Sequence, residues 1–236
     1  MIKLIILCIL LPFTLISSLF INPKKEYDKN SKFYRKLLYT YTWLVLKLLR
    51  IKIEVKGMEK LPKDTRFLLV GNHRSNYDPI ITWLIFRHYD LAFISKESNF
   101  KIPIFGRIIR KCCFMAIDRE NPRNAIKTIT RASNLLKENE VSIAVYPEGT
   151  RNKESKGLLP FHNSVFKIAQ KANVPIVVVG IAGTETIHKR TPWKRSTVNL
   201  HVLEVIDAEK VKEMKTNEIG EHVQNTILES DLITEN

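Results

Sequence analysis

Residues 72–79 (NHRSNYDP) contain a histidine and an aspartate whose spacing suits general-base chemistry. Residues five apart on a regular helix point about 140° away from each other, so His73 and Asp78 can meet only where a loop turns into a helix. Asp78 would then accept a hydrogen bond from one imidazole nitrogen, and the other nitrogen would remove a proton from a substrate hydroxyl. The alternative is that Asp78 only caps the helix and His73 has no chemical role.

A second segment, residues 145–151 (VYPEGTR), follows an apolar run and combines a glycine, a hydroxyl and a guanidinium. Gly149 lets the backbone approach a ligand closely. Arg151 offers a planar fork of donors to an oxyanion. This combination predicts a loop that binds a phosphate or glycerol group. A plain surface turn is the alternative, because Pro-Glu-Gly is common turn chemistry.

A third candidate is the tripeptide Ile-Asp-Arg at residues 117–119, at the end of another apolar run. Arg119 could bind a phosphate while Asp118 orients its guanidinium. Alone, this pair is equally typical of a surface ion pair, so its interpretation depends on the other two segments.

The elements before these segments must position them, and the hydropathy pattern predicts a strand before each one. Runs such as FLLVGN and VPIVVVG are apolar on both faces, which is typical of a sheet covered by helices on both sides. Short apolar runs alternate with helical patterns, so we expect an α/β fold with a central mixed, mostly parallel sheet. Strands are expected at 51–56, 66–71, 91–95, 113–117, 141–146, 175–181 and 197–206. Helices are expected at 79–89, 101–111, 122–138, 163–173 and 208–230.

The N-terminal segment, residues 4–23, contains twenty residues without a charge. As a helix it would extend about 30 Å, the thickness of a membrane's hydrocarbon core. Lysines and arginines are frequent among the residues that follow it, and this asymmetry places the rest of the chain on the cytoplasmic side. We expect an uncleaved membrane anchor, with a cleaved signal peptide as the alternative.

Residues 33–50 form a second apolar stretch, which basic residues flank and aromatic residues interrupt. Aromatic side chains with basic ends suit the headgroup region, so we expect a helix that lies at the membrane interface. A second membrane span and a helix packed on the domain are the alternatives. The chain thus divides into an N-terminal membrane anchor with an interfacial helix (1–50) and a catalytic domain (51–236).

The charge balance indicates an anionic partner, because the formal net charge is +14. Residues 1–60 hold twelve Lys or Arg and only four Asp or Glu, beside the most apolar part of the chain. This placement favours an anionic membrane surface, and the sequence has no nucleic-acid-binding motif. Three cysteines cannot form a disulfide framework, and no spacing predicts a metal site.

Taken in order, NHRSNYD, IDR and YPEGTR resemble the lysophosphatidic acid acyltransferase family (1-acylglycerol-3-phosphate O-acyltransferases) of the glycerolipid acyltransferases. The resemblance extends over residues 67–180. It implies a membrane enzyme that moves a fatty acyl group to the hydroxyl of 1-acylglycerol 3-phosphate and gives phosphatidic acid in phospholipid biosynthesis. The donor would be acyl-CoA or acyl carrier protein, and no cofactor would be needed.

The resemblance also implies a role for each motif residue. His73 would be the catalytic base and Asp78 its partner. Arg119 would contact the glycerol phosphate. The acceptor would be bound by the loop residues Glu148, Gly149, Thr150 and Arg151.

Other functions stay open at this point. Residues 161–164 (FHNS) lack the lysine and glycine that the family commonly has there, so the acceptor could be another lyso-lipid or glycerol 3-phosphate. A thioesterase that uses Cys112 or Cys113 is a rival from another enzyme class. A non-enzymatic lipid-binding protein is a further rival, but it gives NHRSNYD and YPEGTR no reason to occur together.

Overall fold

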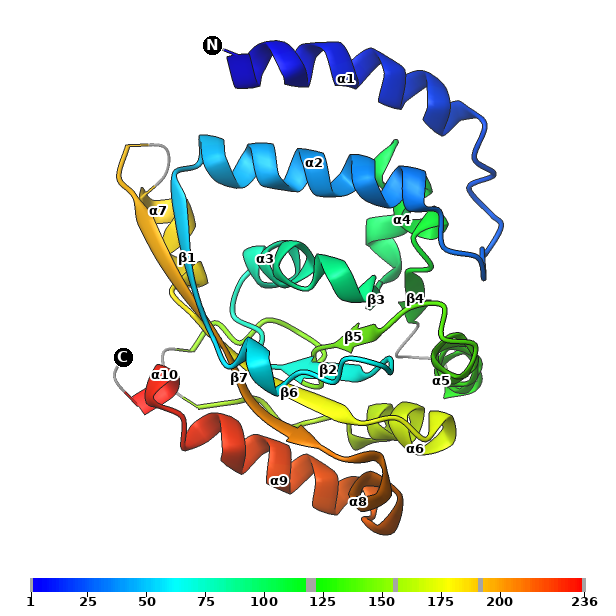
Figure 1. Ribbon diagram of the computed structural model, residues 1–236, viewed down its shortest axis with the longest axis vertical. Helices are drawn as coiled ribbons and strands as arrows, with labels where there is room; N and C mark the ends of the chain where they lie inside the picture. Colours follow the sequence, from blue (N-terminus) through cyan, green and yellow to red (C-terminus); the bar gives the residue numbers. More distant parts are fainter. Residues whose placement is uncertain (1, 118–121, 155–156, 191–192, 235–236) are drawn as a thin grey trace.

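The computed structural model describes residues 2–117, 122–154, 157–190 and 193–234, with the backbone alone for residues 2–9, 122, 233 and 234. Its centre is a seven-stranded sheet in the order β1-β7-β6-β2-β5-β3-β4 (Figure 1). All seven expected strands are present, and the expected mixed, mostly parallel sheet covered by helices is confirmed. The strands are β1 (Ile51–Lys56), β2 (Leu68–Gly71), β3 (Ala92–Lys96), β4 (Met115–Ile117), β5 (Ile143–Val145), β6 (Ile176–Ala182) and β7 (Ser196–Ile206).

Neighbouring strands run parallel except for the pair β6 and β7. Strands β2, β3, β4, β5 and β6 therefore share one direction, and β1 and β7 run against them. The carboxyl ends of β2, β5 and β6 consequently lie at the same edge of the sheet. In α/β proteins this edge is where functional loops gather.

Helices cover both faces of the sheet (Figure 1). They are α1 (Ile2–Leu19), α2 (Lys32–Leu48), α3 (Tyr77–Ile85), α4 (Phe105–Lys111), α5 (Pro122–Lys137), α6 (Lys167–Ala172), α7 (Ile187–Arg190), α8 (Ala208–Glu213), α9 (Thr216–Leu228) and α10 (Asp231–Thr234). Single 3₁₀ turns are η1 (Met58–Lys60), η2 (Arg87–Tyr89), η3 (Glu97–Lys101), η4 (Asn163–Phe166) and η5 (Thr184–Thr186).

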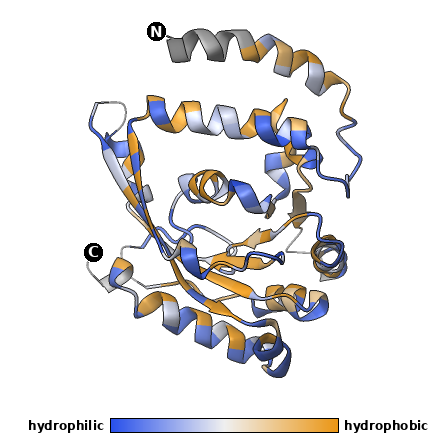
Figure 2. Cartoon of the chain, in the orientation of Figure 1, coloured by the Kyte–Doolittle hydropathy of each residue, from blue (hydrophilic) through white to orange (hydrophobic). Residues whose placement is uncertain are grey.

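The core explains why the strands are apolar on both faces. Leu68 and Val70 of β2 belong to the cluster that packs against α5, α6, α8 and α9. Leu69, between them, belongs to the opposite cluster, which α3 and α2 cover. Side chains alternate across a strand, so a strand that is buried on both sides has no polar position. Figure 2 shows these central strands as predominantly hydrophobic.

The single helix that the pattern predicts at 208–230 is two helices in the structure. The backbone is extended at Met214 (ψ 149°) and Lys215 (ψ 154°), which ends α8 and separates it from α9. The Glu218 carboxylate then accepts a hydrogen bond from the backbone N–H of Lys215 at 2.7 Å. This first-turn contact stabilises a new helix start, which the apolar periodicity does not reveal.

The N-terminal helix α1 forms, but it lies along α2 (Figure 1). Thr14 Oγ1 and the Tyr41 hydroxyl are 2.6 Å apart, and the Tyr34 hydroxyl donates to the carbonyl of Ser17 at 3.0 Å. Within the part of the chain that the structure describes, no helix is both long enough and apolar enough to cross a membrane. The expected membrane-spanning helix at 4–23 is thus not found: α1 ends at Leu19 and makes polar contacts with α2.

Helix α2 packs on the domain through a buried arginine. The Arg35 side chain donates to the carbonyls of Leu91 (2.7 Å) and Cys112 (3.0 Å), and it lies over the ring of Trp83. The carboxylate of Asp90 is 3.5 Å away. A charged group is stable in such a place only when its donors are satisfied, so these contacts determine where α2 sits on α3 and β3.

Candidate active site

His73 and Asp78 lie together where the loop after β2 enters α3. Nδ1 of His73 is 2.8 Å from Oδ2 of Asp78. An ionised carboxylate can only accept, so Nδ1 carries the hydrogen and Nε2 has a free lone pair. The Asp78 side chain is fully buried, whereas the His73 side chain keeps 16% of its surface exposed. The pair therefore has an oriented imidazole with one side open to a substrate.

Asp78 is not the N-cap residue of α3, although the helix-capping interpretation requires it to be. The N-cap is Asn76, and Asp78 lies in the first turn of α3. Its carboxylate turns back and accepts hydrogen bonds from the backbone N–H groups of Arg74 and Ser75, each at 2.7 Å. Asp78 thus stabilises the loop that holds His73, and the same oxygen faces the imidazole.

Thr184 completes the surroundings of Asp78, and the sequence motifs do not include it. Its buried hydroxyl donates to Oδ1 of Asp78 at 2.5 Å. Thr184 starts the turn η5 after β6, where Gly183 has a φ of +88°. A Cβ at Gly183 would lie 2.5 Å from the carbonyl oxygen of Thr197, so only glycine fits this turn. In the sequence, the dipeptide Gly-Thr directly after an apolar strand was the pattern that could have indicated Thr184.

Asn72 joins the ends of β2 and β6, a role that its place in the NHRSNYD motif does not indicate. Its side-chain amide donates to the carbonyl of Ile181 and accepts from the N–H of Ile181, both at 2.8 Å. A side chain that pairs with both backbone groups of one residue fixes the distance between two strands. This contact holds His73 and Thr184 at the same sheet edge.

Tyr146, at the end of β5, packs its ring against the imidazole of His73. Its ring stacks on His73 with the centroids 4.5 Å apart and the planes 15° from parallel. Burial, with a smaller contribution from Asp78, raises the pKa of Tyr146 well above its usual range. The phenol is therefore neutral, and it donates to Thr82 Oγ1 at 3.3 Å.

Glu148 was expected among the acceptor-binding residues, and the structure shows what its carboxylate touches. One oxygen accepts from the backbone N–H of His73 at 2.7 Å, and the other accepts from the N–H of Leu159 at 2.9 Å. The residue is only 3% exposed. Burial raises the pKa of Glu148, although the two N–H donors oppose this effect. Glu148 is thus engaged with the loops around the imidazole.

The other three residues of that loop lie beside the histidine. Gly149 has a φ of +73°, a conformation that favours glycine. Thr150 and Arg151 are exposed, and the next residue, Asn152, donates its backbone N–H to the carbonyl of His73 at 2.7 Å. The backbone of this loop therefore lies beside His73, and Thr150 and Arg151 belong to its exposed part. Arg119, expected to contact phosphate, lies outside the described residues.

The two adjacent cysteines are the candidate nucleophiles of the thioesterase alternative. Cys112 and Cys113 are fully buried, and burial raises the pKa of each thiol to about 12. Neither thiol can supply a thiolate near neutral pH, which argues against the thioesterase alternative.

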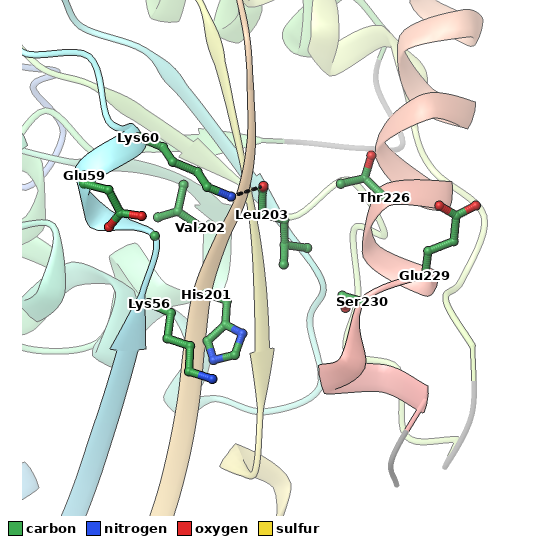
Figure 3. Close-up of a pocket in the computed structure, with 10 residues that line it drawn as sticks. Lys56, Glu59, Lys60, His201, Val202, Leu203, Thr226, Glu229 and Ser230 are labelled. Atoms are coloured by element: carbon green, nitrogen blue, oxygen red, sulfur yellow. Dashed lines mark hydrogen bonds between the residues drawn. The ribbon is translucent and has the colours of Figure 1, made fainter.

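A pocket of about 490 Å³ lies between β1, β7 and α9, and it contains Lys56, His201 and Ser230 (Figure 3). None of the predicted site residues lines it.

The described residues contain no cluster of His, Cys, Asp or Glu that could hold a metal ion. The arrangement around His73 is instead an imidazole whose Nδ1 bonds to a buried carboxylate and whose ring stays partly exposed. Such a site can deprotonate a hydroxyl.

Comparisons with known proteins show the family of the chain. The family model described as Acyltransferase matches residues 52–182. The 1-acyl-sn-glycerol-3-phosphate acyltransferase of Haemophilus influenzae is 30% identical over 160 residues, which cover 68% of this chain and 66% of the relative. Its namesake from Escherichia coli is 28% identical over 178 residues, covering 75% of this chain and 72% of that protein. The matched part of this chain spans 62% of the yeast (Saccharomyces cerevisiae) relative with the same name.

A solved structure extends the similarity to the whole fold. The crystal structure of the 1-acyl-sn-glycerophosphate (LPA) acyltransferase from Thermotoga maritima superimposes with a TM-score of 0.70 at 26% identity. The superposition covers 92% of this chain and 85% of that one. The likeness therefore includes elements on both sides of the segment that the family model matches.

Proposed function

Because this chain belongs to the acyltransferase family, we propose that it transfers a fatty acyl group to the free hydroxyl of 1-acylglycerol 3-phosphate, with His73 as the general base. The product is phosphatidic acid, a precursor of phospholipids. One observation carries the proposal: Nδ1 of His73 bonds to the buried carboxylate of Asp78 at 2.8 Å and leaves Nε2 as the acceptor of a proton. The relatives' names supply the substrate class.

The reaction is a single displacement. The acceptor hydroxyl lies against Nε2 of His73, which takes its proton as the oxygen attacks the thioester carbonyl of the donor. The tetrahedral intermediate collapses, and the thiolate of the donor leaves and takes up the proton. Asp78 stabilises the imidazolium that exists between these steps, as its hydrogen bond to Nδ1 strengthens when the ring is charged.

The acceptor's phosphate is assigned to the exposed guanidinium of Arg151, assisted by Arg119 and Thr150. Arg151 directly precedes Asn152, whose backbone N–H donates to the carbonyl of His73, so the backbone at Arg151 lies near the base. Gly149 keeps that loop close to the ligand. Glu148 contributes indirectly, through the two backbone groups that it binds. The acyl donor is acyl-CoA or acyl carrier protein, and no cofactor takes part.

The enzyme works at the cytoplasmic face of a membrane in this proposal. Helices α1 and α2, with the residue that follows α1, expose large apolar side chains, which suits insertion among lipid headgroups. These are Leu11, Phe13, Leu15, Ile16, Leu19, Phe20, Phe33, Trp43, Val45 and Leu48. Basic residues between and beside the helices favour an anionic surface. The observed packing of α1 on α2 supports a pair of helices lying on the bilayer.

The test is an acyl-transfer assay with radiolabelled lysophosphatidate, in which acyl-CoA and acyl carrier protein are compared as donors. His73→Ala should reduce turnover at least 100-fold, because a general base contributes ~10²–10⁴ in rate. His88→Ala is the control, since His88 is exposed and distant from Asp78 in sequence. Circular dichroism confirms that both variants fold. Retention of a tenth of the activity by His73→Ala would refute the assignment, and a preference for glycerol 3-phosphate would change the acceptor.

A further inference from the structure

A second candidate for membrane contact lies outside α1 and α2, between α7 and β7. Trp193 in this segment is 85% exposed, which is the highest value among the large apolar side chains that are described as exposed. Four exposed cations flank it, namely Lys189, Arg190, Lys194 and Arg195. We call these five residues the Trp193 cluster. A tryptophan ring beside lysine and arginine is the composition that proteins place in the headgroup region of a bilayer.

The charges of the Trp193 cluster are available to a partner. Among the described residues, none of its four cations forms an ion pair, whereas cations elsewhere, such as Lys29 and Lys52, do so. Four like charges that are close in sequence repel one another and attract an anionic surface. The cluster is therefore complementary to acidic lipid headgroups.

The cluster is continuous with the apolar outer side of α2. Arg50, two residues after the end of α2, donates from Nη1 to the carbonyl of Trp193 at 3.3 Å. Ile51 pairs with Ser196 in the parallel register of β1 and β7. The exposed side chains of Val45 and Leu48 lie in the last turn of α2. Figure 1 shows the start of β7 at the same end of the molecule as the end of α2.

The cluster is also connected to the active site by a short, well-packed segment. Thr184 binds Asp78, and Ile187, three residues later, is fully buried at the start of α7. The backbone N–H of Lys194 then donates to the carbonyl of Arg190 at 2.7 Å. The Trp193 cluster thus lies a few residues along the chain from the residue that binds Asp78.

We propose that the Trp193 cluster binds the surface of an anionic bilayer, with the indole among the headgroups and the cations on lipid phosphates. Together with α1 and α2 it would form a third point of contact. Three points fix the orientation of the sheet edge relative to the membrane. The inference rests on the membrane location in the proposed function, and it adds a site that the N-terminal region does not include.

The test uses the chain described here and vesicles of phosphatidylcholine, either alone or mixed with anionic phosphatidylglycerol. Lys194→Glu/Arg195→Glu should weaken binding to the anionic vesicles at least ten-fold and leave binding to neutral vesicles unchanged. Lys210→Glu/Lys212→Glu is the control, with the same change of charge on exposed residues of α8. Equal affinity of the first variant and the unmodified chain for anionic vesicles would overturn the proposal.

Fluorescence reports the depth of the indole. In the Trp43→Phe variant only Trp193 and the buried Trp83 emit, and vesicles of brominated lipid should quench the emission of Trp193. Adding Trp193→Phe to this variant gives the emission of Trp83 alone, which is subtracted. An absence of quenching would contradict insertion.

The same variants also distinguish binding to lipid from binding to an acidic protein such as acyl carrier protein. If Lys194→Glu/Arg195→Glu raises the KM for acyl carrier protein without changing vesicle binding, the cluster binds the donor and the lipid proposal is wrong. Vesicle binding is measured on the His73→Ala variant as well. That result is independent of the proposed activity, so the two proposals can fail separately.

Discussion

The hydroxyl of Thr184 donates to Oδ1 of Asp78 at 2.5 Å, while Oδ2 of the same carboxylate lies 2.8 Å from Nδ1 of His73. Both oxygens of a fully buried carboxylate are thereby engaged, one by the turn after β6 and one by the loop after β2. A buried carboxylate with one free oxygen could rotate away from the imidazole. Thr184 prevents this rotation and so preserves the orientation of the base.

Thr184→Val removes the hydroxyl and keeps the volume and β-branching of the side chain. We expect kcat to fall about ten-fold, because loss of a buried hydrogen-bond donor costs ~1–3 kcal/mol and ~1.4 kcal/mol corresponds to ten-fold in rate. The KM for the acceptor should change little, since Thr184 is buried. Steady-state kinetics measure both values. Thr184→Ser should restore most of the rate; a serine variant as slow as the valine variant would argue against the role of the hydroxyl.

Glu148→Gln should damage both stability and turnover. Glutamine has one acceptor oxygen, so its NH₂ group must face the backbone N–H of either His73 or Leu159. A buried unsatisfied donor costs ~1–3 kcal/mol, which urea unfolding can detect, and kcat should fall with it. The control is Glu154→Gln, an exposed acid in the same loop region. A rise in the KM for the acceptor with unchanged kcat would instead support direct binding by Glu148.

Arg151→Ala should raise the KM for lysophosphatidate at least ten-fold, because a charge-assisted contact to phosphate contributes ~1.5–3 kcal/mol. The free energy of unfolding should stay the same, since Arg151 is exposed. Kinetics with a range of acceptor concentrations give the KM, and Lys153→Ala is the control for general loss of positive charge. If both variants behave alike, the phosphate does not bind at residue 151.

Cys112 and Cys113 should resist thiol reagents in the folded chain. Burial raises the pKa of each thiol to about 12, compared with about 9 in an unfolded chain. Their neutral form therefore stabilises the fold fully below pH ~9, and this stability is lost as the pH rises toward 12. In a Cys8→Ser variant, we expect no rapid reaction with Ellman's reagent at pH 8.5 until urea unfolds the chain. Rapid labelling of the native protein would mean that the thiols are accessible.

Arg35→Met should destabilise the attachment of α2. The change leaves the carbonyls of Leu91 and Cys112 without their donor and takes one cation from Asp90. Breaking a buried pair by removing one partner costs ~3–5 kcal/mol. Lys32→Met is the matched control, because Lys32 also pairs with Asp90 but its side chain is 73% exposed. Such a pair is worth ~0.2–1 kcal/mol, so equal effects in thermal unfolding would contradict the role of Arg35.

The strands could be predicted from the sequence because their signal is local. Val177 and Val178 face opposite clusters of the core, and an uninterrupted apolar run records this directly. The predicted strand at 175–181 consequently differs from β6 by one residue at each end. The helical pattern at 208–230 was less informative, because one hydrogen bond from Lys215 to Glu218 starts a second helix without interrupting the apolar periodicity.

Helix α1 shows that hydropathy alone does not predict where an apolar helix lies. An uncharged run of twenty residues predicts a membrane span when it is considered alone. In the fold, Thr14 and Ser17 of this helix contact the tyrosines of α2, which no property of the isolated segment indicates. Whether an apolar helix crosses a bilayer or lies beside another helix depends on the partner that is available to it.

The sequence by itself determined the α/β fold and the two loops that carry His73 and Arg151, since strand patterns and turn residues are properties of short segments. The tertiary structure alone decided that Thr184 reaches Asp78 across 106 positions of the chain and that Glu148 binds backbone groups beside the base. These contacts depend on which strand ends share an edge of the sheet. Strand order follows from the packing of the whole domain, so no single segment contains it.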